Sequence, residues 1–172
     1  MTAMFYKRVK FFNYFRLFFL GVVVIGLVLY FQAPIVGQVR SVGLFENINL
    51  APNFQPDPFI VRGISGGEIA ASGISGRKET LNGSCVGFVD ESPDHVIILK
   101  GFFKKLSLQI ESEDDTTLVV RGPGGSWCND DDPGRGKNAG ISGEWLEGSY
   151  QIWVGSYQEK RYQPYVIRFS QK

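Results

Sequence analysis

Carboxylates and carboxamides gather in one stretch of this 172-residue chain. Asn129, Asp130 and Asp131 lie in a glycine-rich segment, and Asp115 lies shortly upstream. Several such oxygens on neighbouring loops are what a hard cation such as Ca²⁺ requires, although the spacing of an EF-hand loop is absent. The alternative is a solvated acidic turn, whose side chains accept hydrogen bonds from nearby backbone amides. The sequence leaves both interpretations open.

Candidate catalytic residues are few. Residues 63–67 match the G-x-S-x-G turn that carries the nucleophile of many hydrolases. That turn needs a following helix and a histidine base, yet no helical pattern follows Gly67, and His95 is the one histidine. We therefore predict no catalytic residues, and a structural role at a strand edge for His95. Gly-Ile-Ser-Gly recurs from Gly73 and from Gly140, which favours ordinary turn chemistry over a structural repeat.

The chain contains two cysteines, Cys85 and Cys128, separated by 43 positions. In a cytosolic protein we would expect two buried thiols, whereas outside the membrane a disulfide is favoured. Their spacing does not match that of zinc ligands. We predict a disulfide, with two free thiols as the alternative.

Two aromatic residues near the C-terminus, Trp153 and Tyr157, form a possible binding surface. Trp153 alternates with Tyr150, Ile152 and Val154, so it points to the opposite face of a strand. Exposed there, it would stack against sugars or a partner's side chains. The alternative is that Trp153 packs against a second sheet or an edge loop.

Short apolar stretches between turn residues predict the elements that position these groups. The clearest strands cover residues 96–99, 106–111, 117–121, 150–155 and 165–170, and weaker ones cover 68–72 and 85–89. In one of them, Leu106, Leu108 and Ile110 alternate with polar residues, so one face is buried. This recurrence predicts an all-β fold, an antiparallel β-sandwich, over residues 48–172.

Residues 1–32 predict a membrane segment. Residues 17–31 are uncharged and mostly apolar, and basic residues precede them. This pattern fits either an uncleaved transmembrane anchor or a cleaved signal peptide. In both cases the basic flank keeps the N-terminus in the cytoplasm and places the C-terminal domain in a periplasmic, luminal or extracellular space. We expect residues 33–47 to form a linker.

The net charge of +1 hides an uneven distribution. Five of the 18 Lys and Arg residues lie in residues 1–40, which contain no acid, so 13 bases remain against 17 acids beyond them. We expect no nucleic-acid partner for the folded part, because binding phosphates requires a basic face.

From residue 48 onward the chain resembles the bacterial pre-peptidase C-terminal (PPC) domain family. The matching segments are residues 115–120, 122–125, 129–131, 148–150, 152–157 and 165–167, with Asn138 before Ile141. Four upstream segments, 56–58, 65–67, 85–87 and 93–95, resemble a cysteine-containing variant found in exported cyanobacterial and other bacterial proteins. The resemblance implies a calcium-associated, jelly-roll-like sandwich without catalytic residues, but no particular partner.

Together these features predict a non-catalytic, membrane-anchored extracytoplasmic module that binds a protein or a polymer such as a polysaccharide. One alternative is a small single-pass accessory subunit of a membrane protein complex. A third is a secreted protein released by signal cleavage.

Overall fold

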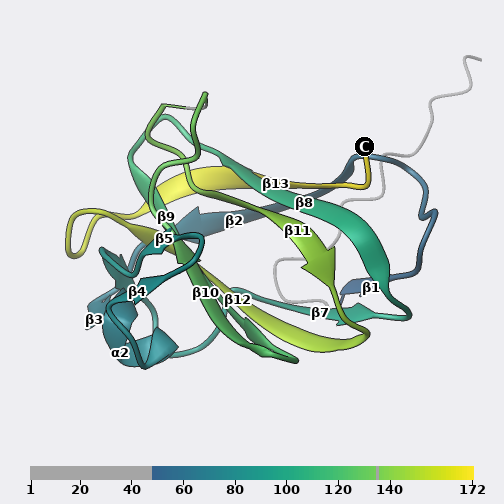
Figure 1. Cartoon of the computed structure of the whole chain (residues 1–172). Helices are drawn as coiled ribbons and strands as arrows, with labels where there is room; N and C mark the ends of the chain where they lie inside the picture. Colours follow the sequence, from purple (N-terminus) through teal and green to yellow (C-terminus); the bar gives the residue numbers. More distant parts are fainter. Residues whose placement is uncertain (1–47, 135) are drawn as a thin grey trace, which may run out of the picture. The chain divides into compact units, whose positions relative to one another are not determined.

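The computed structural model describes residues 48–134 and 136–172. The membrane segment and linker expected over residues 1–47 lie outside this part of the chain. Within it, no helix has both the length and the apolar character needed to span a membrane. The described residues are almost entirely β-structure, which confirms the fold class predicted from strand alternation (Figure 1).

The larger sheet is built around β12 (Gly148–Ser156). One side of β12 pairs with β9 (Thr116–Gly122), which pairs in turn with β10 (Gly125–Asn129). The other side of β12 pairs with β7 (His95–Leu99). These pairs are antiparallel, whereas the three-residue β1 (Ile48–Leu50) runs parallel to β7. At β1 the sandwich therefore departs from the wholly antiparallel arrangement expected.

The smaller sheet contains four antiparallel strands in the order β11, β8, β13, β2. Their bounds are Gly140–Trp145 for β11, Phe103–Glu111 for β8, Gln163–Ser170 for β13 and Phe59–Ser65 for β2. The ladder between β11 and β8 is irregular between Gly143 and Trp145. Strand β11 forms one edge of this sheet, as β10 forms one edge of the larger sheet.

The segment between β2 and β7 forms a third, smaller layer. It contains β3 (Ile69–Ala70), the five-residue helix α2 (Ala71–Ser75), the hairpin of β4 (Glu79–Thr80) with β5 (Gly83–Ser84), and β6 (Phe88–Val89). In Figure 1 this layer lies together at the lower left, beside β9 and β10. Strand β6 pairs with both β3 and the end of β12, so the layer continues the larger sheet.

The main core lies between the two sheets. Leu106, Leu108 and Ile110 of β8 are fully buried there, as their alternation predicts, and Ile152 and Val154 of β12 meet them from the opposite sheet. Burying a side chain of this size stabilises a fold by roughly 1.5–3 kcal/mol. A second, smaller core lies on the other face of β9 and β12 and consists of Ala71, Cys85, Val89, Val119, Cys128 and Trp153, with Ile74 packed against it.

All five strands predicted most clearly are present as β7, β8, β9, β12 and β13. The two weaker predictions are partly wrong: residues 68–72 end in helix α2, and residues 85–89 contribute only β6. The three Gly-Ile-Ser-Gly copies are neither equivalent nor turns, because they lie in β2, α2 and β11. The conformation of so short a motif is decided by its tertiary surroundings.

Candidate binding site

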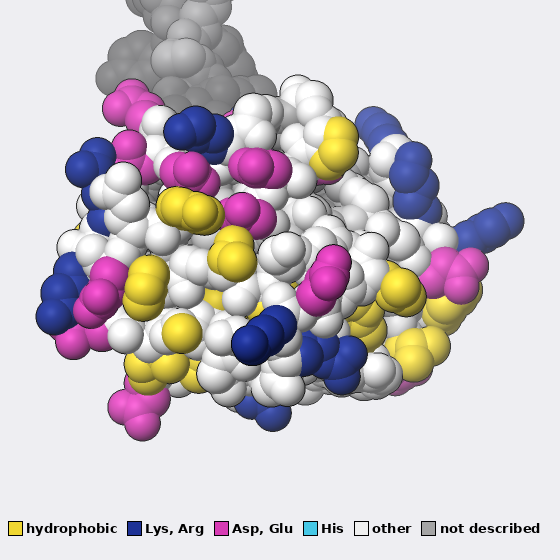
Figure 2. All heavy atoms as spheres, turned by 60° about the vertical axis from the view of Figure 1, so that its left-hand side comes forward, with side chains coloured by type: hydrophobic (Ala, Val, Ile, Leu, Met, Phe, Trp, Pro, Cys, Tyr) yellow, Lys and Arg dark blue, Asp and Glu magenta, His cyan; other side chains and the backbone are white. Residues whose placement is uncertain are grey.

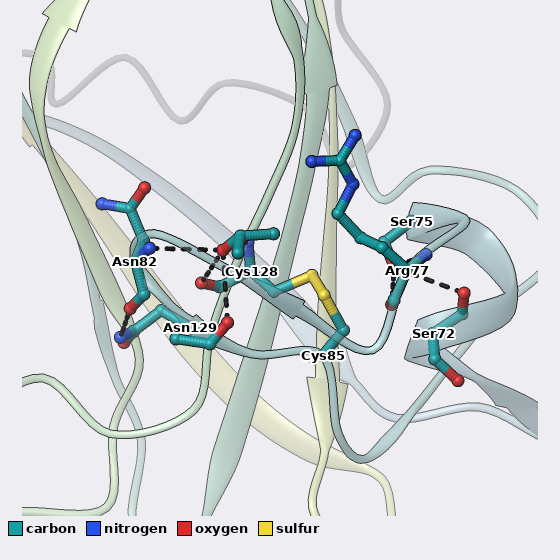
Figure 3. The surroundings of a disulfide bond; sticks show 9 residues. Ser72, Ser75, Arg77, Asn82, Cys85, Cys128 and Asn129 are labelled. Atoms are coloured by element: carbon teal, nitrogen blue, oxygen red, sulfur yellow. Dashed lines mark hydrogen bonds between the residues drawn. A yellow bond between two sulfur atoms is a disulfide. The ribbon is translucent and has the colours of Figure 1, made fainter.

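Asn129, predicted to ligate a cation, instead joins two edges of the fold. Its Oδ1 accepts a hydrogen bond from the backbone N–H of Gly140 in β11 at 2.8 Å. Its Nδ2 donates to the backbone oxygen of Asn82 at 2.7 Å, as Figure 3 shows, and weakly to that of Asp131 at 3.4 Å. Because both ends of the amide are engaged with the protein, Asn129 has a positioning role.

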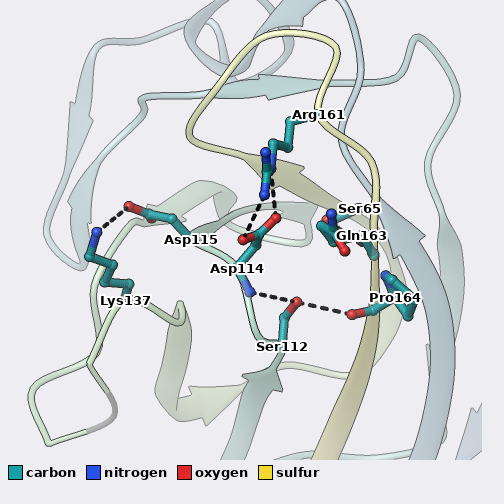
Figure 4. A network of polar contacts seen from close by, with 8 residues as sticks. All are labelled: Ser65, Ser112, Asp114, Asp115, Lys137, Arg161, Gln163 and Pro164. Atoms are coloured by element: carbon teal, nitrogen blue, oxygen red, sulfur yellow. Dashed lines mark hydrogen bonds and ion pairs between the residues drawn. The ribbon is translucent and has the colours of Figure 1, made fainter.

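The three aspartates of the predicted calcium site remain near one another. Burial, followed by the charges of Asp131 and Asp115, raises the pKa of Asp130 to about 6. Burial also raises the pKa of Asp115, against the opposing effect of Lys137 at 3.8 Å (Figure 4). Within the described residues, the Oδ1 atoms of Asp115 and Asp130 are buried without a hydrogen-bond partner. Repulsion between carboxylates favours a neighbouring cation.

The electrostatics of this loop favour a bound cation, but its geometry does not provide a complete set of ligands. Across residues 48–134 and 136–172, no three His, Cys, Asp or Glu side chains are grouped to hold a metal ion. Calcium takes six to eight oxygen ligands, so two unpartnered carboxylate oxygens are a small part of a complete set. Calcium binding therefore stays a prediction. Nearby, Asp114 forms a two-contact ion pair with Arg161 at 2.7 and 3.1 Å (Figure 4).

The predicted disulfide is present in the structure. Cys85, just after β5, is bonded to Cys128 in β10, and the bond ties the third layer to the larger sheet (Figure 3). Thr80 reinforces this attachment, because its hydroxyl accepts from the N–H of Cys128 at 3.0 Å and lies 3.1 Å from its carbonyl oxygen.

The prediction that Trp153 forms a binding surface is wrong. Trp153 points away from the main core, as its alternation requires, but the third layer covers it and leaves it only 3% exposed. Tyr157 is 52% exposed, but Trp153 does not lie beside it on the surface as expected. The alternative, packing of Trp153 against further structure, is therefore correct.

His95 and Ser65 form hydrogen bonds within the fold and have structural rather than catalytic roles. His95 Nε2 lies 2.8 Å from the hydroxyl of Tyr165 across the main core, and burial lowers the pKa of His95 to about 4. Burial and the hydrogen bond from Val154 act in opposite directions on adjacent Asp94, and its pKa rises to about 7. Ser65 lies within β2, and its hydroxyl donates to the backbone oxygen of Gln163 at 3.2 Å. The G-x-S-x-G match is thus not a nucleophile turn.

An aromatic pocket, not predicted from the sequence, opens between the edge strands β10 and β11. Trp127 of β10 stacks on Trp145 of β11 with 6.5 Å between ring centroids, and the ring of Tyr150 lies 4.9 Å from Trp145. The indole N–H of Trp145 donates to Leu106 O, and the hydroxyl of Tyr150 donates to Leu146 O, both at 3.0 Å. These bonds fix the floor of the pocket.

The walls of the pocket are more accessible than its floor. Phe102 and Leu146 line it and are 51% and 53% exposed, and Asn82 and Glu144 add polar groups. Gly122 permits the floor, because a Cβ atom there would lie 2.2 Å from the ring of Tyr150. In the sequence, the only signal for this pocket was the presence of Trp127 and Trp145 beside glycine-rich segments. The two side chains meet because β10 and β11 are edge strands of different sheets.

Side chains of different kinds are mixed over the face formed by the third layer. Figure 2 shows acidic, basic and apolar groups interspersed there, with no broad region of one sign. The feature best suited to binding is therefore the pocket, since concave apolar sites with a few polar groups are the usual form of ligand sites.

Comparison with known proteins adds a few similarities. No model of a known protein family matches the chain. A protein of Synechococcus elongatus, described as uncharacterized, is 28% identical over 159 residues, which cover 90% of this chain and 98% of that protein.

Two solved structures each align with 73% of the chain. The pre-peptidase C-terminal domain of the collagenase from Bacillus anthracis has a TM-score of 0.43 and 11% identity, over 73% of this chain and 95% of that domain. PliG, a periplasmic inhibitor of g-type lysozyme from Aeromonas hydrophila, has a TM-score of 0.34 and 14% identity, over 73% of this chain and 97% of that protein. The fold assignment rests on the strand pairing above, and the family resemblance stays a prediction.

Proposed function

We propose that this chain is a non-catalytic binding module of PPC type that works outside the cytoplasm. The observation that carries the location is the disulfide between Cys85 and Cys128. Structural disulfides form and persist in oxidising compartments and are rare in the cytosol. The basic residues before the apolar stretch 17–31 agree with this location, since they favour a cytoplasmic N-terminus and an exported C-terminal domain.

Binding is proposed over catalysis because the groups that a reaction would need are engaged elsewhere. His95 is buried against Tyr165, and Ser65 is buried in a strand. The aromatic pocket, in contrast, is open to solvent with exposed apolar walls. Concave sites with apolar walls and a few polar groups are the usual form of binding sites. The partner is proposed to be a protein, with a polysaccharide as the second possibility.

A second candidate function is a single-pass accessory subunit of a membrane complex. Phe102 and Leu146 favour it, because a neighbouring subunit would remove both exposed side chains from water. In this arrangement residues 1–32 dock in the membrane and the sandwich covers the outer face of the complex.

Calcium is proposed as a stabilising ion at Asp115, Asp130 and Asp131. The support is electrostatic: two buried, unpartnered carboxylate oxygens lie among charges that raise the pKa values of Asp115 and Asp130. A bound divalent cation would offset this repulsion. Asn129 is not included, because its amide is already bonded on both sides.

The test is purification of the full chain from membranes in mild detergent, followed by native mass spectrometry. A stoichiometric complex supports the accessory subunit. A monomer that binds an added protein or oligosaccharide supports the independent module. Recovery from the cytosolic fraction with both thiols reduced would contradict either form of the proposal.

A further inference from the structure

The pocket between β10 and β11 lies beside the edges of both sheets. Its volume of about 400 Å³ falls in the range of sites that bind small ligands or large side chains. Among the described residues, β10 pairs only with β9 and β11 only with β8, so each has an outer edge.

The outer edge of β10 is partly closed. The backbone N–H of Cys128 faces outward and donates to the Thr80 side chain. The β4–β5 hairpin thus occupies that edge beside the disulfide.

The outer edge of β11 is closed at Gly140 and open at Ser142. In an antiparallel ladder, backbone groups point alternately toward and away from the partner strand. Gly140 donates its N–H to Asn129 of β10, so it is one of the outward-facing residues. The residue two positions on, Ser142, therefore also directs its backbone N–H and C=O away from β8. Ser142 lines the pocket, so an open strand edge and an apolar pocket are adjacent.

The lining of the pocket has one charge and several apolar side chains. Glu144 is the one ionisable acid or base among the described residues of the lining besides Tyr150, whose hydroxyl is bonded to Leu146 O. Phe102 and Leu146 extend the apolar surface to solvent, and Leu81, which precedes the lining residue Asn82, is fully exposed at 106%. An apolar rim of this kind suits a large side chain of a protein.

We propose that this site binds an extended polypeptide segment, which pairs with β11 at Ser142 and places an apolar side chain in the pocket against Trp127. A basic residue next to that side chain faces Glu144. The inference rests on the proposed binding function and specifies its ligand. Addition of a strand to an open sheet edge is an established way for proteins to bind peptides, with the backbone giving affinity and pockets giving specificity. A sugar could stack on the aromatic faces, but only an extended backbone would continue the ladder from Ser142.

The probes are synthetic peptides of about six residues, the length of an ordinary strand, with alternating threonine and lysine and one central phenylalanine. They are added to isotope-labelled full-length chain in detergent micelles. Amide resonances of β11 and the indole resonance of Trp127 are expected to shift on binding. Replacing the central phenylalanine with serine is expected to abolish the shifts.

Two backbone-methylated versions of the same peptide test strand addition directly. Each carries N-methyl groups on every second amide, so each loses its donors along one edge only. Strand addition predicts that one of the two fails to bind and that the other binds as the parent does. Equal binding of both would overturn pairing with β11.

A charge reversal with a matched control tests the pocket. Glu144→Lys is expected to weaken the lysine peptide about fivefold and to strengthen a glutamate version. Glu147→Lys makes the same change in net charge three residues later, at an exposed position outside the lining, and is expected to leave binding unchanged. Equal effects of both variants would mean that only long-range charge matters, which contradicts this site.

The outcomes separate this inference from the proposed function. If no peptide shifts β11 while cellohexaose shifts the Trp127 indole, the peptide site is overturned and a binding module remains. The same holds if a copurifying partner cross-links to another face. If the chain binds no probe and copurifies with no partner, both proposals fail.

Discussion

Replacing Asp94 with Asn tests how the fold accommodates an ionisable group where its two sheets meet. Asp94 Oδ2 accepts a hydrogen bond from the N–H of Val154 in β12 at 2.7 Å. Burial, and after it the charge of the Asp94 carboxylate, raises the pKa of Tyr165 in β13. Burial dominates and raises the pKa of Asp94 from 3.8 to about 7, with a smaller contribution from Asp90. The neutral isostere keeps an acceptor for Val154 and removes the charge.

The two neighbours Asp94 and His95 respond to pH in opposite directions. Between pH 3.8 and 7 the folded chain holds a proton on Asp94 that the unfolded chain releases, so acid stabilises the fold through this group. The pKa of His95 falls from 6.5 to about 4, so in that range the unfolded chain binds the extra proton and acid destabilises the fold. Each linked proton is worth about 1.4 kcal/mol per pH unit, so the two effects nearly cancel in the wild type.

In Asp94→Asn only the effect of His95 remains. We expect the variant to be more stable than the wild type at pH 7, and this advantage to decrease by roughly 3 kcal/mol between pH 6.5 and 4. That figure is an upper limit, because Asp94 keeps some contact with water. His95→Gln is the matched control and should gain stability relative to the wild type over the same range.

The assay is urea unfolding of the full chain in detergent, followed by tryptophan fluorescence at a series of pH values from 7 to 4. Differences between variant and wild type remove the contribution of Asp130, which titrates in all the proteins alike. A difference between Asp94→Asn and wild type that does not change with pH would refute the reasoning, because it would mean that Asp94 is charged in the folded state throughout.

Further measurements test other parts of the structure. Replacing both Cys85 and Cys128 with Ala should lower the free energy of unfolding by about 4 kcal/mol, the value of the chain-entropy model for a 43-residue separation. A free energy equal to that of the oxidised protein would contradict this prediction. A reporter fused after Lys172 should be active only outside the cytoplasm, and cytoplasmic activity would reject the proposed topology. Calcium should raise the melting temperature, because binding adds about 2.7 kcal/mol to the free energy of unfolding at ~100 times the dissociation constant. Asp130→Asn should remove this response. An equal effect of magnesium would indicate screening alone. Gly122→Ala should displace the ring of Tyr150 and cost at least ~1 kcal/mol, and a stability equal to wild type would show that the pocket floor is not tightly packed.

The main core could be predicted because its pattern is local. Leu106, Leu108 and Ile110 alternate with polar residues, and that period of two fixes which side of β8 is buried. Two strands that were missed, β10 and β11, begin with glycine, and β11 contains a second one, so the sequence there indicates turns. In β2, packing requires the glycine at position 63. A Cβ atom there would lie 2.3 Å from the hydroxyl oxygen of Tyr165, a residue 102 positions away.

The site was harder to predict because it depends on which distant segments meet. Alternation gave the correct face for Trp153, but whether that face is covered depends on the third layer and its disulfide. Asn129 stands among carboxylates in the sequence, and its role as a bridge exists only because Gly140 lies opposite it. The pocket at Trp127 requires two edge strands from different sheets, which no local pattern encodes.

The side chains that close the edges of β10 and β11 also bear on aggregation. An unpaired strand edge is a template on which a second copy of a chain can add, and natural sheets block such edges. Thr80 blocks β10 at Cys128, and Asn129 blocks β11 at Gly140, so only a short stretch of either strand stays available. If the proposed anchor holds the chain in a membrane, copies crowded together in its plane would meet edge to edge often. Along β10 and β11, so little open edge remains that fibril-like pairing there is restricted to one short segment, whereas β2 at the opposite edge of the smaller sheet pairs only with β13 among the described residues.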